Sequence, residues 1–209
     1  MTPQPHPFRA EHFRRADEDP DSAFYGFARL VTHIDDAAIA ALTQFYRRFL
    51  SADSDVLDLM SSWVSHLPAE MAYRGVVGLG MNAEELAANP RLTRALVHDL
   101  NRTPALPFAD ASFDACLIAV SVQYLARPLE VFAEIARVLR PGGGLAVSFS
   151  NRMFPTKAVA LWQALDDGGH ADVVGLYCRL AGFAAPDVVD LSPAPGASDP
   201  LYVVTARKA

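Results

Sequence analysis

The sequence predicts an α/β domain built around a mostly parallel β-sheet with helices on both of its faces. Three observations lead to this prediction. Short apolar runs of strand length recur through residues 56–149, helical segments lie between them, and proline and glycine mark the returns from helix to strand. Strands that alternate with helices favour parallel pairing, because each helix carries the chain back across one face of the sheet. A chain of 209 residues that is 51% hydrophobic forms one such domain more readily than two.

The residues before the first strand show a different pattern. Residues 1–30 mix charged and aromatic side chains without a sustained period, which predicts an arm or lid. Asp35 or Asp36 can cap the helix that follows. The apolar residues of this helix recur at steps of three and four, namely Ile39, Leu42, Tyr46 and Phe49. We therefore predict an N-terminal arm and cap helix over residues 1–50 and the main fold over residues 51–209, as one domain overall.

Five short apolar runs predict strands that are buried on both faces of the sheet. Each run is followed by polar residues, as expected where a strand reaches the edge of a sheet. The runs are Val56–Leu59, Val76–Leu79, Ala95–Val97, Ala115–Val120 and Leu145–Phe149. Because parallel strands end at the same edge, the polar residues after them form one rim.

Helices between these runs have recognisable start and stop signals. Asn82 followed by Glu85 resembles a capping box, and Pro128 suits the first turn of a helix. From Pro128 to Arg140 one apolar stripe is formed by Leu129, Phe132, Ile135 and Leu139. The segment Pro141–Gly144 then stops this helix and turns the chain into the next strand.

The C-terminal part predicts two more helices and a last pair of strands. The helices are expected at about residues 156–166 and 171–181, and the strands at residues 187–191 and 201–206. The loop between the two strands is rich in proline and glycine and has no helical pattern. Such a connection favours an antiparallel pair at one edge of the sheet.

Composition and charge exclude several classes of function. The chain has 18 basic and 24 acidic residues, and its formal charge of -6 repels nucleic-acid phosphates. The longest apolar run, around Cys116 to Val120, is too short to cross a bilayer, and Met1 to Pro7 lack an apolar signal core. We therefore expect a cytoplasmic protein that binds neither nucleic acid nor membranes.

Cysteines and histidines do not form a recognisable metal or disulfide framework. Cys116 and Cys178 have no CxxC spacing, and both fit apolar packing positions. The six histidines are scattered, and no HExxH pattern is present. We predict that the protein needs no metal.

A long segment, Leu106 to Ser150, closely resembles the later half of class I S-adenosylmethionine-dependent methyltransferases that act on small molecules. The resemblance rests on Leu106-Pro107-Phe108, on Phe113-Asp114 at a strand start, and on the Leu139 to Gly143 sequence LRPGG after an amphipathic helix. It extends over roughly residues 52–206. It implies a Rossmann-like, seven-stranded, mostly parallel sheet with an antiparallel edge strand, S-adenosylmethionine as cofactor and a small-molecule methyl acceptor.

The predicted cofactor site lies at the rim formed by the strand ends. Open α/β sheets bind ligands beyond the carboxyl ends of their strands. The resemblance also assigns Asp99 a place near the adenine amino group. The candidate cofactor residues are Asp58, Met60, Ser61, Ser62, Gly80, Met81, Asp99, Leu100 and Ala119.

The candidate acceptor site lies beyond the fourth and fifth strands. The residues predicted to bind the acceptor are Gln123, Asn151 and Arg152. Methyl transfer depends mainly on positioning, and a base is needed only if the acceptor must lose a proton. His66 and Tyr124 are the candidates for that base.

The cofactor loop departs from the pattern of the family. Members usually have DxGxGxG after the first strand, whereas Asp58 to Val64 reads DLMSSWV, with Met60, Ser62 and Val64 in place of glycine. Each of these side chains crowds a ligand that lies against the turn. Gly80 stands where the family has an acid that binds both ribose hydroxyls, and each such bond contributes about 1.5 to 3 kcal/mol.

Other interpretations remain open, both for single residues of this loop and for the function of the protein. Ser61 and Ser62 can cap a following helix instead of binding cofactor, and His66 can lie on the surface of that helix. The protein can also have kept the methyltransferase fold while losing catalysis, as a binding or regulatory module. A third alternative is a related fold that holds another nucleotide-like ligand. The acceptor and the oligomeric state are not predicted.

Overall fold

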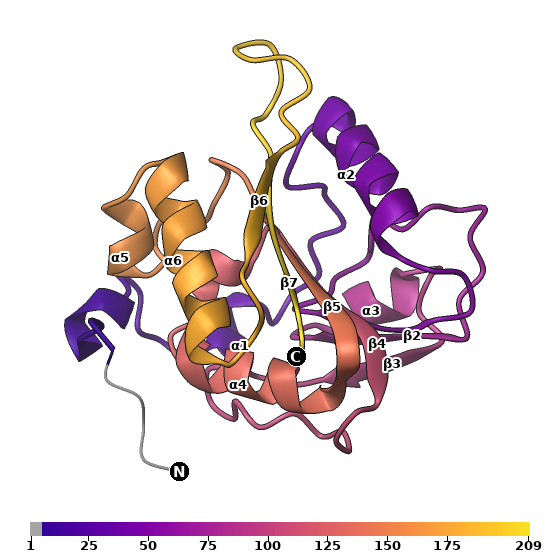
Figure 1. Ribbon diagram of the computed structural model, residues 1–209. Helices are drawn as coiled ribbons and strands as arrows, with labels where there is room; N and C mark the ends of the chain where they lie inside the picture. The colour runs from indigo at the N-terminus through magenta and orange to yellow at the C-terminus, as the bar shows by residue number, and fades with distance from the viewer. Residues whose placement is uncertain (1–5) are drawn as a thin grey trace.

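The computed structural model describes residues 6–209 and contains a seven-stranded sheet in the order β3-β2-β1-β4-β5-β7-β6 (Figure 1). The strands β1 to β5 are mutually parallel, and β7 is antiparallel to both of its neighbours. The strands are β1 Asp55–Leu59, β2 Gly75–Gly80, β3 Arg94–Val97, β4 Phe113–Ala119, β5 Leu139–Phe149, β6 Asp187–Asp190 and β7 Tyr202–Arg207. The predicted α/β class and mostly parallel sheet are confirmed.

The last two strands form the predicted antiparallel pair at one side of the sheet. β7 lies between β5 and β6, so the antiparallel strand is one position in from the edge, which β6 occupies. No helix lies between β6 and β7 along the chain. Without a crossover helix the chain reverses direction between adjacent strands.

Helices cover both faces of the sheet. The helical segments are the 3₁₀ helices η1 Ala10–Phe13 and η2 Val122–Tyr124 and the α-helices α1 Asp21–Phe24, α2 Asp36–Phe49, α3 Ala83–Ala88, α4 Pro128–Val138, α5 Ala160–Gln163 and α6 Asp167–Leu180. Val56 of β1 is in one apolar cluster with α2, whereas Leu57 and Leu59 are in the other with α4 and α6. Figure 1 accordingly shows α2 and α6 on opposite sides of the sheet. Cys116 and Cys178 are both buried in the second cluster, as predicted.

Side-chain caps start α2 and α3 at the predicted places. Asp35, rather than Asp36, caps α2, because its Oδ1 accepts a hydrogen bond of 2.8 Å from Ala38 N. Asn82 caps α3 through bonds from the backbone N–H groups of Glu84 and Glu85. The Glu85 carboxylate does not complete the predicted capping box, since it bonds Arg29 N and the Ser62 hydroxyl instead.

Three predicted elements differ in the structure. The helix α4 ends at Val138 rather than Arg140, and Pro141–Gly144 belong to β5. The predicted helix over residues 156–166 shrinks to the four residues of α5, because Val159 N and Ala160 N donate to the carbonyls of residues 123 and 14 instead of continuing a helix. The strand β3 is not buried on both faces, since it pairs only with β2, and Val97 is exposed.

None of the helices within residues 6–209 combines the length and the apolar character needed to cross a bilayer.

We predict that Asp35→Ala destabilises the protein by about 1 to 2 kcal/mol, because the first turn of α2 loses its cap. The same carboxylate also accepts a bond of 2.7 Å from Asp199 N, which holds the β6–β7 connection against α2. Urea denaturation measures the effect. Asp36→Ala is the matched control, since Asp36 is exposed and adjacent in the sequence. Equal losses in the two variants contradict the assigned cap.

Candidate functional site

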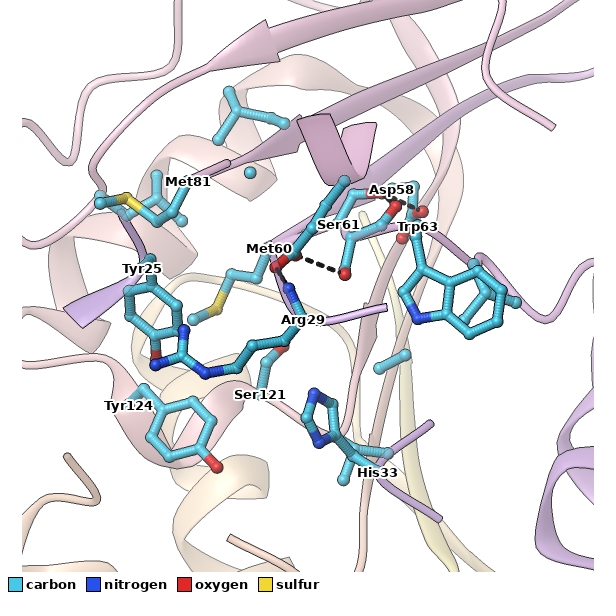
Figure 2. A pocket seen from close by; sticks show the side chains of 18 of the residues that line it. Tyr25, Arg29, His33, Asp58, Met60, Ser61, Trp63, Met81, Ser121 and Tyr124 are labelled. Carbon is cyan, nitrogen blue, oxygen red and sulfur yellow. Dashed lines mark hydrogen bonds between the residues drawn. The ribbon is translucent and has the colours of Figure 1, made fainter. Parts of the chain in front are cut away.

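A pocket lies at the carboxyl ends of β1, β2 and β4, where the N-terminal arm closes over the sheet (Figure 2). It encloses a cavity of about 140 Å³. The structure brings together here all of the predicted cofactor residues, Asp58, Met60, Ser61, Ser62, Gly80, Met81, Asp99, Leu100 and Ala119. His66 and Tyr124 line the same pocket.

The three residues predicted to bind the acceptor lie outside this pocket. Gln123 is buried, and its amide group donates to the carbonyls of Val120 and Arg152. Asn151 and Arg152 are exposed on the segment after β5. Arg152 lies 3.9 Å from a carboxylate oxygen of Asp199. These contacts hold the chain after β4 and β5 in place and do not face the cavity.

The arm supplies lining residues that the sequence did not single out. Trp63 Nε1 donates a bond of 2.9 Å to Val31 O, which joins the arm to the loop after β1. The arm residues of the pocket are Asp21, Tyr25, Arg29, Val31, Thr32, His33 and Ile34. Glu85, Asn101, Ser121 and Phe154 complete the lining from the domain side, together with neighbouring apolar residues. The only signal in the sequence was the gathering of aromatic residues around Arg29.

The turn after β1 adopts a left-handed backbone at Met60, with φ of 59°. Residues other than glycine rarely adopt this backbone conformation, because their Cβ atom approaches the following carbonyl oxygen, at a cost of about 1 to 2 kcal/mol. Met60 therefore holds, with a side chain, a backbone conformation that glycine adopts freely. Its side chain lies in the pocket, as Figure 2 shows.

A buried hydrogen-bond cluster around Asp58 holds the loop after β1. Asp58 is 3% exposed, and its Oδ2 accepts hydrogen bonds of 2.6 Å from both Ser61 Oγ and Ser65 Oγ. Asn89 donates to Ser65 and to the Ser62 carbonyl. Burial raises the pKa of Asp58 to about 6 despite these two hydroxyls. No helix follows β1, so the alternative of Ser61 and Ser62 as helix caps is wrong.

Gly80 has a structural reason to lack a side chain. A Cβ at this position would lie 2.1 Å from the Ser61 carbonyl oxygen, which is too close for any residue. The loop after β1 thus excludes the acid that the family places there. A carboxylate reaches the pocket from α3 instead, where Glu85 accepts a bond of 2.6 Å from Ser62 Oγ.

The two candidate bases are not poised to take a proton near neutral pH. His66 lies in the loop after β1, not on a helix, and burial lowers its pKa to about 4. The Tyr124 hydroxyl accepts a bond of 2.8 Å from Phe154 N, and burial raises its pKa. No group of three or more His, Cys, Asp or Glu side chains is arranged for a metal ion within residues 6–209. Metal independence stays a prediction.

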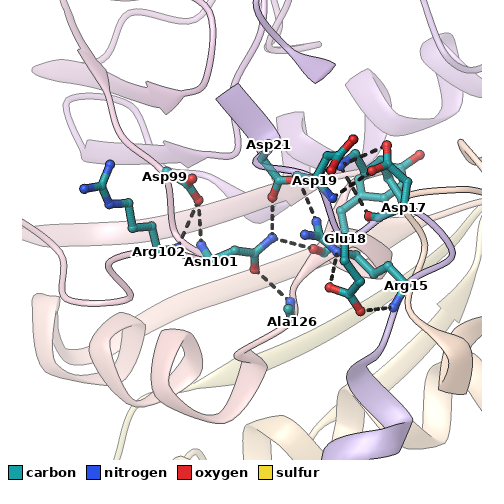
Figure 3. Close-up of polar contacts among 11 residues, drawn as sticks. Arg15, Asp17, Glu18, Asp19, Asp21, Asp99, Asn101, Arg102 and Ala126 are labelled. Atoms are coloured by element: carbon teal, nitrogen blue, oxygen red, sulfur yellow. Dashed lines mark hydrogen bonds and ion pairs between the residues drawn. The ribbon is translucent and has the colours of Figure 1, made fainter. Parts of the chain in front are cut away.

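A buried ionic network anchors the arm beside the pocket (Figure 3). Asp21 pairs with Arg15 at 2.6 Å and accepts a bond of 2.7 Å from Asn101, which also donates to the Tyr124 carbonyl. Lys157, which is 1% exposed, lies 3.3 Å from Asp21 and 3.1 Å from the Asp17 carboxylate. These bonds tie the arm to the segments that follow β3, β4 and β5.

Comparisons with known proteins agree with this geometry. A family model described as a methyltransferase domain matches residues 62–147. An S-adenosylmethionine-dependent methyltransferase from Aquifex aeolicus has a similar fold, with a TM-score of 0.59 at 19% identity over 84% of this chain and 99% of that one. The chain therefore has the fold of class I S-adenosylmethionine-dependent methyltransferases, and its residues 62–147 match a methyltransferase domain.

Other similar proteins differ in length and in the reaction that they catalyse. An uncharacterized methyltransferase of Mycobacterium sp. (strain JLS) is 30% identical over 179 residues, which cover 84% of this chain and 63% of that protein. The chain spans less than two thirds of the length of the first curated relatives it matches. The cyclase SpnF has a TM-score of 0.57 at 19% identity, over 80% of this chain and 79% of that one. These similarities establish the fold, which alone does not determine the reaction.

We predict that Gly80→Ala destabilises the protein by about 1 to 3 kcal/mol, because the new methyl group collides with the Ser61 carbonyl. Gly75→Ala is the matched control in the same strand, where the nearest atoms lie at 3.6 Å and allow ordinary contact. Urea denaturation of both variants measures the difference. A Gly80→Ala protein as stable as the control contradicts the close packing of the loop on β2.

We predict that Asp58→Asn becomes more stable than the wild type as pH rises from 4 to 8, by about 3 kcal/mol in total. The folded-state pKa of about 6 lies above the ordinary value of 3.8, so the wild type loses stability as Asp58 ionises in the folded protein. The asparagine side chain can still accept from Ser61 and Ser65. Urea denaturation at several pH values gives the difference in free energy of unfolding between the variant and the wild type. Because His66 titrates in both proteins, its contribution cancels from this difference. A difference that does not change with pH contradicts the prediction.

Proposed function

We propose that the protein is an S-adenosylmethionine-dependent methyltransferase that acts on an unidentified small molecule. The left-handed backbone at Met60 supports this most strongly, because it occurs at the position where the family's cofactor loop has a glycine. A strained conformation persists only where the surrounding structure holds it, and such strain concentrates at functional sites.

Unpaired polar groups in the pocket fit a polar ligand. Arg29 Nη1, His66 Nδ1 and Ser121 Oγ are buried without a hydrogen-bond partner among residues 6–209, and all three residues line the cavity. Buried polar groups normally have partners, because an unpaired one loses its hydration without compensation. A bound ligand with several polar atoms supplies the missing bonds.

The carboxylates of Asp99 and Glu85 are the polar groups that would bind the adenosine part of the cofactor. Asp99 holds the adenine amino group, and its Oδ1 is fixed by bonds from the backbone N–H groups of Asn101 and Arg102. Glu85 replaces, for the ribose hydroxyls, the acid that the loop excludes at Gly80. The apolar residues Met81, Leu100 and Ala119 line the same part of the pocket.

In this structure the pocket is too small to hold the whole cofactor. Its cavity of about 140 Å³ is smaller than the roughly 300 to 1,000 Å³ of sites for drug-sized ligands. In Figure 2 the side chains of Tyr25 and Arg29 extend from the arm into this space. Cofactor binding therefore involves an outward shift of these side chains or of the arm.

Bound S-adenosylmethionine supplies an activated methyl group, and the protein supplies position and a dry site. The buried side chains of Leu79, Leu100 and Val120 give the pocket apolar walls that exclude water. Holding the acceptor atom in line with the transferred methyl group accounts for most of the expected acceleration. His66 is neutral at pH 7 and serves as a hydrogen-bond acceptor for a protonated acceptor group.

A second candidate function is a binding or regulatory module that has kept the fold and lost catalysis. The close contact between Ser61 and Gly80 favours this alternative, because it removes the family's ribose-binding acid. The cyclase SpnF, with a similar fold, also illustrates that the scaffold is not restricted to methyl transfer.

We predict that S-adenosylmethionine and S-adenosylhomocysteine bind to the full chain in calorimetric titration. At ligand concentrations about 100-fold above Kd, the folded protein gains about 2.7 kcal/mol of stability, which appears as a higher melting temperature. ATP and NAD are the control ligands, and binding of either instead supports a site for another nucleotide. Absence of both heat and thermal shift at millimolar S-adenosylmethionine overturns the enzyme proposal and leaves the binding module.

A further inference from the structure

Arg29 is the one lysine or arginine among the residues that line the pocket. Its guanidinium lies 4.0 Å from the ring centroid of Phe27 and 4.5 Å from that of Phe24, and a third ring, Phe154, is 5.8 Å away. The backbone N of Arg29 donates 2.8 Å to Glu85, which holds this point of the arm against α3. The arm thus presents a cation at the pocket within an aromatic surround.

The charge of Arg29 has no carboxylate partner among residues 6–209, although four acids line the same pocket. Asp21 pairs with Arg15 and Lys157, and Asp58 binds two serine hydroxyls. The other two are also engaged, Glu85 by Ser62 Oγ and a backbone N–H and Asp99 by two backbone N–H groups. Nη1 of Arg29 is buried and makes no hydrogen bond to these residues. The guanidinium is therefore available to a ligand.

We propose that Arg29 binds the carboxylate of the methyl acceptor, which is a small organic acid with an apolar body. A guanidinium presents paired N–H donors that match the two oxygens of a carboxylate. A single cation among four acids favours a monoanion, since a dianionic phosphate meets stronger repulsion. Phe154 and Trp63, which line the pocket, provide the apolar contact. The assignment to the acceptor rests on the proposed methyltransferase function.

The position of the guanidinium favours the acceptor over the methionine end of the cofactor. Ser61 and Ser62, which are among the predicted cofactor residues, follow β1. In Figure 2 the Arg29 side chain runs away from Ser61, and its guanidinium lies over the rings of Phe24 and Phe27. The ionised Arg29 also acts to lower the pKa of Tyr25, although burial outweighs this effect and raises it. The carboxylate site is thus separate from the loop after β1.

Phenylacetate and its neutral counterpart phenylacetamide test this proposal on the full chain. Calorimetric titration is run with and without saturating S-adenosylhomocysteine, so that a pocket shaped by cofactor is included. Phenylacetate is expected to bind about ten- to a hundredfold more tightly than phenylacetamide, because only the acid forms the charge-assisted pair. Equal binding of the two probes, or binding of neither, overturns the proposal.

Variants assign the effect to Arg29. Arg29→Met keeps a long side chain between the aromatic rings and is expected to lose the preference for phenylacetate, whereas Arg29→Lys retains part of it. Arg94→Met, at an exposed position on β3, is the matched control and should bind both probes like the wild type. Melting temperatures establish that each variant is folded. An unchanged preference in Arg29→Met overturns the proposal.

A last comparison separates acceptor from cofactor. S-adenosylhomocysteine carries a carboxylate, and 5′-methylthioadenosine lacks it. If Arg29→Met weakens only the first of these about tenfold, Arg29 holds the cofactor and the acceptor assignment is overturned. If the wild type binds phenylacetate through Arg29 but never S-adenosylhomocysteine, the methyltransferase proposal fails while the carboxylate site stands. The two proposals therefore fail by different observations.

Discussion

The pocket depends on the contact between the loop after β1 and the end of β2. Ser61 N donates a bond of 2.9 Å to Leu79 O, and the Ser61 carbonyl occupies the space beside Gly80. The backbone N and carbonyl O of Ser61 are thus both held in place. Its hydroxyl donates to the buried Asp58 carboxylate. This close packing leaves no room for an acidic side chain at position 80, and it lies directly after the left-handed turn at Met60.

The arm is part of the fold rather than an appendage, because its charges are buried against the domain. Lys157 and Arg15 both pair with Asp21, and each of these side chains is less than a tenth exposed. Removing one partner from such a network leaves an uncompensated buried charge, which costs about 3 to 5 kcal/mol. These ion pairs lie at one end of the segment that carries Tyr25 and Arg29. A stronger network therefore makes it harder for this segment to move and for the pocket to open.

Local patterns in the sequence were sufficient for the sheet, for α2 and α4, and for the lining residues at strand ends, because each of these depends on periodicity, caps or chain direction. The course of the arm was not predictable, since its contacts join residues far apart, such as Arg29 with Glu85. The same reason explains the lost helix after Thr156, whose backbone groups bond the arm. A glycine at position 80 looked like a loss of function in the sequence, but only the structure shows the carbonyl that requires it.

The affinity of this pocket for a ligand depends on the free energy needed to move the Tyr25 and Arg29 side chains, or the arm, outward. A ligand that binds only the open form has its apparent affinity lowered by the fraction of molecules that are open, so each 1.4 kcal/mol of opening cost weakens binding about tenfold. Ligands that satisfy His66, Ser121 and, through an acceptor carboxylate, Arg29 gain bonds that the closed form lacks. Methyl transfer needs position more than acid–base chemistry, so the low pKa of His66 does not by itself exclude catalysis. The balance between the buried ion pairs and these unpaired groups therefore sets the affinity of the pocket for its ligands.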